Sequence, residues 1–208
     1  MVKVSGPAFS LDASGTIGST LVFSKWKGRN YIRSHVVPSN PKSGGQVGMR
    51  AMFAFLAKAW ATLSDANQAT WEDRAAQLIA SEFNAFMSYN QFRWRNFTAP
   101  SKEDPAAVAS TPAVVGALSL TLGVRSITVT QAITTANDGW GICIFRSPTG
   151  TFTPTFDKLI AVGTISGTDN VVHVDSPLDP GAYYYDTCEF TDDGQLSAET
   201  GEETETVV

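Results

Sequence analysis

Residues 178–190 read LDPGAYYYDTCEF and set the character of the C-terminal half of the chain. A Pro-Gly turn leads into a run of aromatic residues and Thr, which favour extended backbone. Asp193-Gly194 provides the next turn signal, and Leu196 begins another strand-like run. A strand between two turn signals is therefore predicted here, within a β-rich region.

Six similar runs, separated by Gly, Pro, Asn and Asp, accompany the run Tyr183–Phe190. They are Leu118–Leu122, Ser126–Ala132, Trp140–Arg146, Leu159–Ile165, Val171–Val174 and Thr204–Val208. About seven short strands in about 100 residues predict an all-β immunoglobulin-like or fibronectin-III-like sandwich over residues 113–208. The segment around Tyr183 also resembles the start of strand F in a fibronectin type III domain, where a tyrosine fixes the corner.

The composition of the chain changes near residue 100. Residues 98–114 read TAPSKEDPAAVASTPAV, a Pro-, Ala- and Ser-rich stretch typical of a linker. The pattern before it is helical and the pattern after it is strand-like. We therefore expect a linker at 100–112, between an α+β region and the sandwich.

The α+β region is expected to hold about three short helices. One runs from Ser43 to about Leu63, a second follows Ser64 as N-cap, and a third spans about Glu82–Arg93. Their apolar positions recur at spacings of three and four: Met49, Met52, Phe53, Leu56, Trp60 and Leu63; Trp71, Ala75, Leu78 and Ile79; Phe83, Phe86 and Met87. The glycines in Ser43–Gly48 are interpreted as a flexible hinge rather than an anion site.

A β-hairpin precedes the helices. Residues 21–36 read LVFSKWKGRNYIRSHV, with Lys27-Gly28 as a two-residue turn. This register pairs Trp26 with Arg29, Phe23 with Ile32 and Leu21 with Ser34. One face then carries Trp26, Arg29, Tyr31 and Arg33, a composition enriched at protein interfaces. An isolated hairpin is marginal in water, so it must lie on its own helices or on another chain. Residues 1–20 are Gly- and Ser-rich and are expected to form an extended arm.

Charge is divided unevenly between the two halves of the chain. The net charge of −5 is the sum of +6 over residues 1–100 and −11 over residues 101–208. Between Asp12 and Asp65 there are seven Lys and Arg residues and no acid. This stretch is expected to face something negative: nucleic acid, an acidic protein surface, or the C-terminal half of a neighbouring subunit. The candidate partner-binding residues are Lys25, Trp26, Arg29, Tyr31, Arg33 and Arg50.

No arrangement of residues indicates an enzyme, a metal or a cofactor. The two histidines, His35 and His173, lie in different predicted domains, and there is no Gly-x-Ser-x-Gly elbow. Cys143, His173 and Cys188 lack any local ligand pair for zinc. The aromatic-arginine run Gln91–Phe97 is either a platform for single-stranded nucleic acid or a helix end with Trp94 in the core. No run is long enough for a signal peptide or a membrane span, so a soluble protein with two reduced thiols is expected.

The N-terminal pattern resembles a family of tailed-phage and prophage virion proteins. "SGTIG", the hairpin ending at Arg33, the helix ending at Trp60, "LSDANQATW" at 63–71 and the Phe86–Asn90 helix carry the resemblance. The sequence departs from that family at Lys42–Gly48, where more helix-forming residues are usual. The resemblance implies a non-enzymatic virion structural protein, assembled in the bacterial cytoplasm.

Within that resemblance, an auxiliary capsid protein of the cement or decoration kind is the expected role. Its partners would be the major capsid protein, other virion proteins and copies of itself. A neck, tail or head-fibre protein is one alternative. A nucleic-acid-binding protein that uses the basic N-terminal half is another, disfavoured by the −11 charge of the other half.

Overall fold

The computed structural model describes residues 2–3, 14–37, 39–106, 116–133 and 139–208. The chain divides into two compact units, residues 1–41 and residues 42–208. The division lies near residue 41, whereas the sequence analysis expected it at 100–112.

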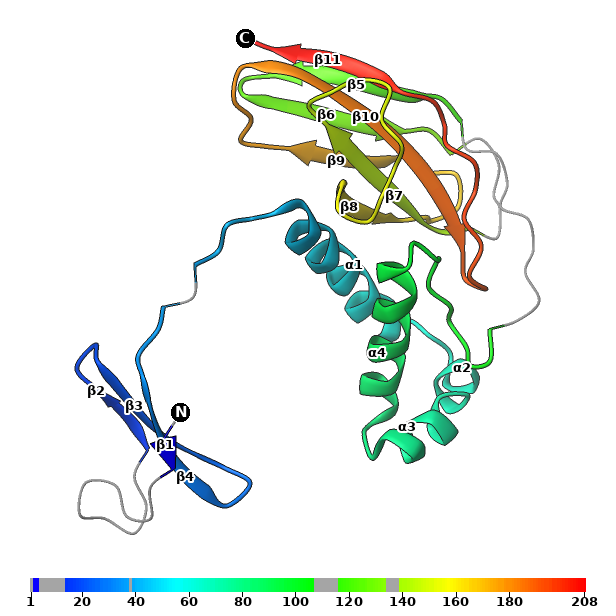
Figure 1. Ribbon diagram of the computed structural model, residues 1–208. Coiled ribbons are helices and arrows are strands. Elements are labelled where there is room, and N and C mark those ends of the chain that lie inside the picture. Colours follow the sequence, from blue (N-terminus) through cyan, green and yellow to red (C-terminus); the bar gives the residue numbers. More distant parts are fainter. Residues whose placement is uncertain (1, 4–13, 38, 107–115, 134–138) are drawn as a thin grey trace. The chain divides into compact units, whose positions relative to one another are not determined.

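The first unit is a four-stranded antiparallel sheet in the order β1-β4-β3-β2. Its strands are β1 (Val2–Lys3), β2 (Gly15–Ile17), β3 (Leu21–Trp26) and β4 (Arg29–Ser34), drawn in blue in Figure 1. The predicted hairpin register is confirmed, because Trp26 pairs with Arg29 and Phe23 with Ile32. Lys27 and Gly28 both have positive φ, as a two-residue hairpin turn of this type requires. The expected arm supplies two short strands that flank the hairpin, a role that its small polar residues did not indicate.

Four helices open the second unit: α1 (Gly44–Trp60), α2 (Asp65–Ala69), α3 (Glu72–Leu78) and α4 (Glu82–Arg95). Ser64 caps α2 as predicted, since its hydroxyl accepts a hydrogen bond from the Asn67 amide. Ser81 caps α4 in the same way through the Asn84 amide. The expected second helix is split at Thr70–Trp71 into α2 and α3.

Two of the predicted apolar stripes are wrong in part. Phe53 is half exposed, and Phe55 is buried in its place. Leu78 and Ile79 lie on the surface rather than on a buried face, because α3 ends at Ile79 in a left-handed conformation. The sequence FAFL at 53–56 offers two phenylalanines, and spacing alone does not choose between them.

Seven strands form two antiparallel sheets in the rest of the second unit. One sheet has the order β11-β10-β7-β8 and the other β5-β6-β9. The strands are β5 (Leu118–Gly123), β6 (Ser126–Gln131), β7 (Gly139–Ser147), β8 (Leu159–Thr164), β9 (Val171–Asp175), β10 (Gly181–Thr191) and β11 (Glu203–Val207). Each of the seven predicted strands is present within two residues of its expected limits, whereas the further run predicted from Leu196 forms only an isolated bridge to Phe190. The N-terminal helices and the antiparallel β region confirm the expected fold class at this level.

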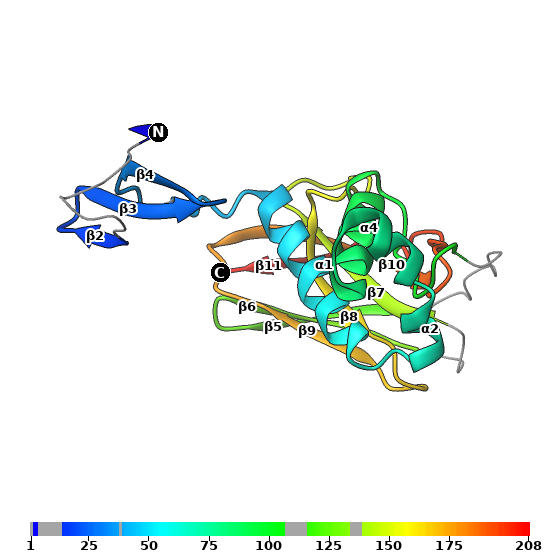
Figure 2. The same ribbon diagram turned by 90° about the horizontal axis from the view of Figure 1, so that it is seen from below.

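The helices and the larger sheet share one hydrophobic core. Phe55 of α1 contacts the rings of Trp140 and Phe190, with centroid separations of 5.3 and 5.2 Å. Trp94 of α4 stacks on Phe145 of β7. Both views of the ribbon show α1 running along this sheet (Figure 2). A second cluster, which includes Ile127, Val129 and Ile144, fills the space between the two sheets. The helices therefore cover the sheet, although the sequence grouped them with the hairpin.

Two glycines allow α1 to approach the loop before β8. A Cβ on Gly44 would lie 2.0 Å from the Asp157 carbonyl oxygen, and one on Gly48 would lie 2.2 Å from that of Phe156. Both glycines belong to α1 itself. The interpretation of Ser43–Gly48 as a flexible hinge is therefore wrong, and the glycines serve close packing instead.

Candidate interaction site

Four of the five predicted contact residues of the hairpin lie on one face of the first sheet. Residues opposite each other on antiparallel strands share a face, so Trp26 with Arg29, and Ser24 with Tyr31, point the same way. Arg33, opposite Val22, belongs to this face too. The Trp26 side chain is 65% exposed, and the Lys27 ammonium lies 5.0 Å from its ring centroid. We call Trp26, Arg29, Tyr31 and Arg33 the basic face.

The two remaining predicted residues lie elsewhere. Lys25 is opposite Asn30, on the other face of the sheet, together with Phe23 and Ile32. Arg50 belongs to α1 in the second unit. Strand alternation places Lys25 on the opposite face of the sheet, and Arg50 belongs to the other unit. The structure therefore brings together four of the six residues that the sequence singled out.

The first sheet has almost no core of its own. Among its described residues, only Phe23 is buried. Ile17 and Leu21 are 57% and 40% exposed. The guanidinium groups of Arg29 and Arg33 make no ion pair within the described residues. A small sheet needs an apolar layer packed on one face for stability. We therefore expect another surface to pack on this sheet.

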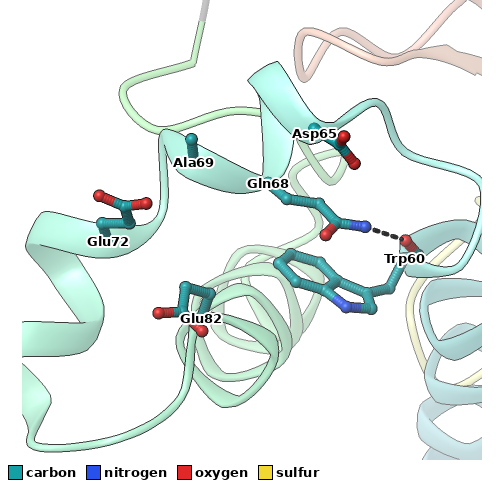
Figure 3. Close-up of a pocket in the computed structure, with 6 residues that line it drawn as sticks. All are labelled: Trp60, Asp65, Gln68, Ala69, Glu72 and Glu82. Carbon is teal, nitrogen blue, oxygen red and sulfur yellow. Dashed lines mark hydrogen bonds between the residues drawn. The ribbon is translucent and has the colours of Figure 1, made fainter.

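The second unit holds a cavity of about 260 Å³ where the end of α1 meets the starts of three other helices. It is lined by Trp60, Asp65, Gln68, Ala69, Glu72 and Glu82 (Figure 3). The Gln68 amide donates to the Trp60 carbonyl oxygen at 3.0 Å, which ties α2 to the end of α1. The Trp60 ring packs against Phe83 and Phe86, which fixes its position as a wall of the cavity. We call this hollow the Trp60 cavity.

Three carboxylates line the Trp60 cavity together with the indole. Asp65, Glu72 and Glu82 each lie in the first turn of a helix, where a negative side chain favours the helix start. None of the three makes an ion pair within the described part of the chain. They also do not form a group that could hold a metal ion. An indole face with dispersed carboxylates suits a larger organic cation, such as a guanidinium or an ammonium group.

Sequence reasoning missed this cavity. Acids at helix starts are ordinary capping features, and the spacing of Trp60, Glu72 and Glu82 has no recognised pattern. The one available signal was the succession of three short helices, since short connections bring several helix starts near one helix end. That signal does not specify which side chains would meet.

The two histidines belong to different units of the chain, and the aromatic-arginine run 91–97 lies at the end of α4. His35 is exposed in the first unit, and His173 is half-buried on β9. Within the described residues, no group of three or more His, Cys, Asp or Glu side chains could hold a metal ion. Trp94 is fully buried, and the Arg93 guanidinium donates to the carbonyl oxygens of Ala99 and Gly194. The alternative of a helix end with Trp94 in the core is therefore confirmed.

The described part of the chain contains no helix that is long and apolar enough to span a membrane. Residues 12–99 match the model of a family of unknown function (DUF6266). The match begins just before β2 and ends after α4, so it covers β2, β3 and β4 of the first sheet together with the helices. No curated protein matches the sequence of the chain.

Proposed function

We propose that the protein is a non-enzymatic structural protein of a tailed-phage particle, and that it acts as an auxiliary capsid protein of the cement or decoration kind. The resemblance of the N-terminal sequence to virion proteins supports the setting. The observation that carries the binding role is the first sheet, in which only Phe23 is buried among the described residues. Such a sheet acquires its missing layer by docking on another surface.

The composition of the basic face supports this docking role. Trp, Tyr and Arg are the residues most enriched at the energetic centres of protein interfaces. The guanidinium groups of Arg29 and Arg33, which make no ion pair with any other described residue, favour a partner with surface carboxylates. Binding of the folded sheet to shell proteins or to neighbouring copies would stabilise both partners by mass action.

For residues 118–207 we propose an immunoglobulin-type sandwich of the fibronectin III kind. The orders β5-β6-β9 and β8-β7-β10-β11 correspond to strands A-B-E and C′-C-F-G of such a fold. The Tyr183 hydroxyl donates to the Asp179 carbonyl oxygen at 3.0 Å, as in a tyrosine corner at the start of strand F. This domain would project from the particle or bridge to a neighbour.

Copy number in purified particles tests the proposed setting. Quantitative mass spectrometry against the major capsid protein should find hundreds of copies for a lattice-wide cement protein. A count near six or twelve would move the protein to the neck, tail or a head fibre. Absence from the particle would overturn the virion proposal and direct attention to salt-dependent nucleic-acid binding by the basic face.

A pair of variants tests the basic face. The double variant Arg29→Ala/Arg33→Ala should fold and yet fail to bind particles that lack the protein. The control Lys58→Ala/Arg95→Ala removes the same charge from outside the first sheet and should bind normally. Normal binding of the Arg29/Arg33 variant would refute the assignment of the basic face.

A further inference from the structure

We propose that the basic face of one copy docks at the Trp60 cavity of a second copy, so that the protein self-associates head to tail. This inference rests on the proposed function and names the partner of the basic face. The ligand of the cavity would be an arginine side chain, with Arg29 next to the hairpin turn as the inserted residue. The two surfaces lie in different units of the chain, and each lacks a partner within the described residues.

The chemistry of the Trp60 cavity fits a guanidinium group. The planar cation can stack on the indole while its five N–H donors reach carboxylates in several directions. Asp65, Glu72 and Glu82 supply those carboxylates from three separate helices. A hollow of about 260 Å³ admits a side chain and excludes a folded strand, so one arginine enters while the rest of the face contacts the rim.

The basic face presents its cations in a suitable arrangement. Arg29 is the first residue of β4 and lies opposite Trp26, at the end of the sheet where the chain turns. Arg33 lies four residues further along the same strand and face, about 13 Å away at the usual rise per residue. The tip of the hairpin can therefore enter a hollow while Arg33 faces the surrounding surface.

Charge complementarity identifies a second copy as the occupant. Residues 15–34 of the first sheet carry four cations and no acid, whereas residues 60–82, which include the lining of the Trp60 cavity, carry four acids and one cation, Arg74, which pairs with Asp104. Two copies aligned head to tail would place opposite charges together, and two copies related by a two-fold axis at the basic face would place like charges together.

A complementation experiment in solution tests the proposal with the full chain and no particle. One variant, Arg29→Gln/Arg33→Gln, keeps its cavity and loses its basic face. The other, Glu72→Gln/Glu82→Gln, keeps its basic face and loses two carboxylates of the cavity. Wild-type protein should show concentration-dependent association by sedimentation velocity that weakens with salt. Each variant alone should associate about tenfold or more weakly.

The equimolar mixture of the two variants is the decisive sample. It should form a one-to-one dimer that grows no further, because each pair retains one intact interface. The matched control Lys58→Gln/Asp157→Asn should associate like the wild type. Circular dichroism and melting temperature establish that each variant is folded.

Three outcomes would overturn the proposal: a wild-type protein that stays monomeric at all concentrations, a mixture that stays monomeric, or variants that associate normally. The monomeric results would indicate docking within one chain or on a different partner. In that case the Arg29→Ala/Arg33→Ala variant would still be expected to lose particle binding, because that test does not depend on self-association. Failure of self-association is therefore distinguishable from failure of the proposed function.

Discussion

Cys143 and Cys188 lie directly opposite each other on the neighbouring strands β7 and β10. Both are free thiols in the core shared by the helices and the larger sheet. The disulfide of antibody domains joins two different sheets, whereas these two cysteines belong to the same sheet. A fibronectin-like layout predicts that these two strands are neighbours in one sheet, and this is confirmed.

The two thiols should resist alkylation in the native protein. Burial raises the pKa of Cys188 to about 12 and the pKa of Cys143 well above its usual value, so little thiolate forms. Iodoacetamide at pH 8 should label the folded chain slowly and should label two thiols per chain in guanidinium chloride. Mass spectrometry of the labelled protein measures both rates. Rapid labelling of the native chain would contradict the observed burial.

Stability should fall as the pH rises above about 9. An unfolded thiol ionises near its ordinary pKa of 9.0, while the buried thiols stay protonated. The unfolded state then binds fewer protons than the folded state, so the free energy of unfolding decreases with pH. Burial also raises the pKa of Tyr185, which adds to the effect. Melting temperatures between pH 8 and 11 measure the slope, which the variant Cys143→Ala/Cys188→Ala should reduce.

Gly48→Ala should destabilise the protein by about 1–3 kcal/mol, since the new methyl group meets the Phe156 carbonyl oxygen and α1 must shift. Gly45→Ala is the matched control in the same helix. Its Cβ would lie 3.5 Å from the Phe156 ring, an ordinary contact, and alanine favours the helix by up to about 1 kcal/mol. Urea unfolding of the two variants should therefore move in opposite directions. A shift in the same direction would refute the close-packing role of Gly48.

Tyr185→Phe should cost about 1.5–3 kcal/mol of stability. The Tyr185 hydroxyl donates to Asp175 at 2.8 Å, and Arg146 donates to the same carboxylate at 2.7 Å. Asp175 lies on β9, while Arg146 and Tyr185 lie on the other sheet, so this cluster ties the sheets together. Tyr184→Phe, whose hydroxyl makes no hydrogen bond within the described residues, should be nearly neutral in denaturant unfolding. Equal losses of stability in Tyr185→Phe and Tyr184→Phe would contradict the link between the two sheets through Asp175.

Acidification should weaken the fold through His173. Burial lowers the pKa of this imidazole below its ordinary value of 6.5, with Arg146 acting in the same direction and Asp175 opposing. Below about pH 6.5 the unfolded state therefore binds a proton that the folded state does not yet bind, and stability declines as the pH falls. Melting curves between pH 7.5 and 5 should show this slope. His173→Gln should flatten it, and an unchanged slope would assign the effect to other groups.

The strands and the hairpin could be predicted from local sequence, because alternation and turn residues act over a few positions. Lys27-Gly28 fixed the register of Trp26 opposite Arg29. The contacts of α1 could not be predicted in this way. Its helical face is apolar enough to pack on a hairpin or on a sheet, and only the tertiary structure selects Phe55 for contact with Phe190.

The candidate site was predictable to a similar extent. The face shared by Trp26, Arg29, Tyr31 and Arg33 follows from the two-residue period of a strand. Arg50 was grouped with it from charge alone, and charge does not report which unit a residue joins. The Trp60 cavity depends on the meeting of four helices, an arrangement that no local pattern encodes.

The contact between Phe55 and Phe190 has a consequence for synthesis of the chain. The helices leave the ribosome first, but the strands that cover their apolar side include β10, which ends at Thr191. At about 5–20 residues per second, Phe55 would wait about 7–27 s for its partner. During that interval the nascent helices expose an aromatic surface to the cytosol. Ribosome-bound intermediates ending before β10 should therefore recruit chaperones, and completion of the strand should release them.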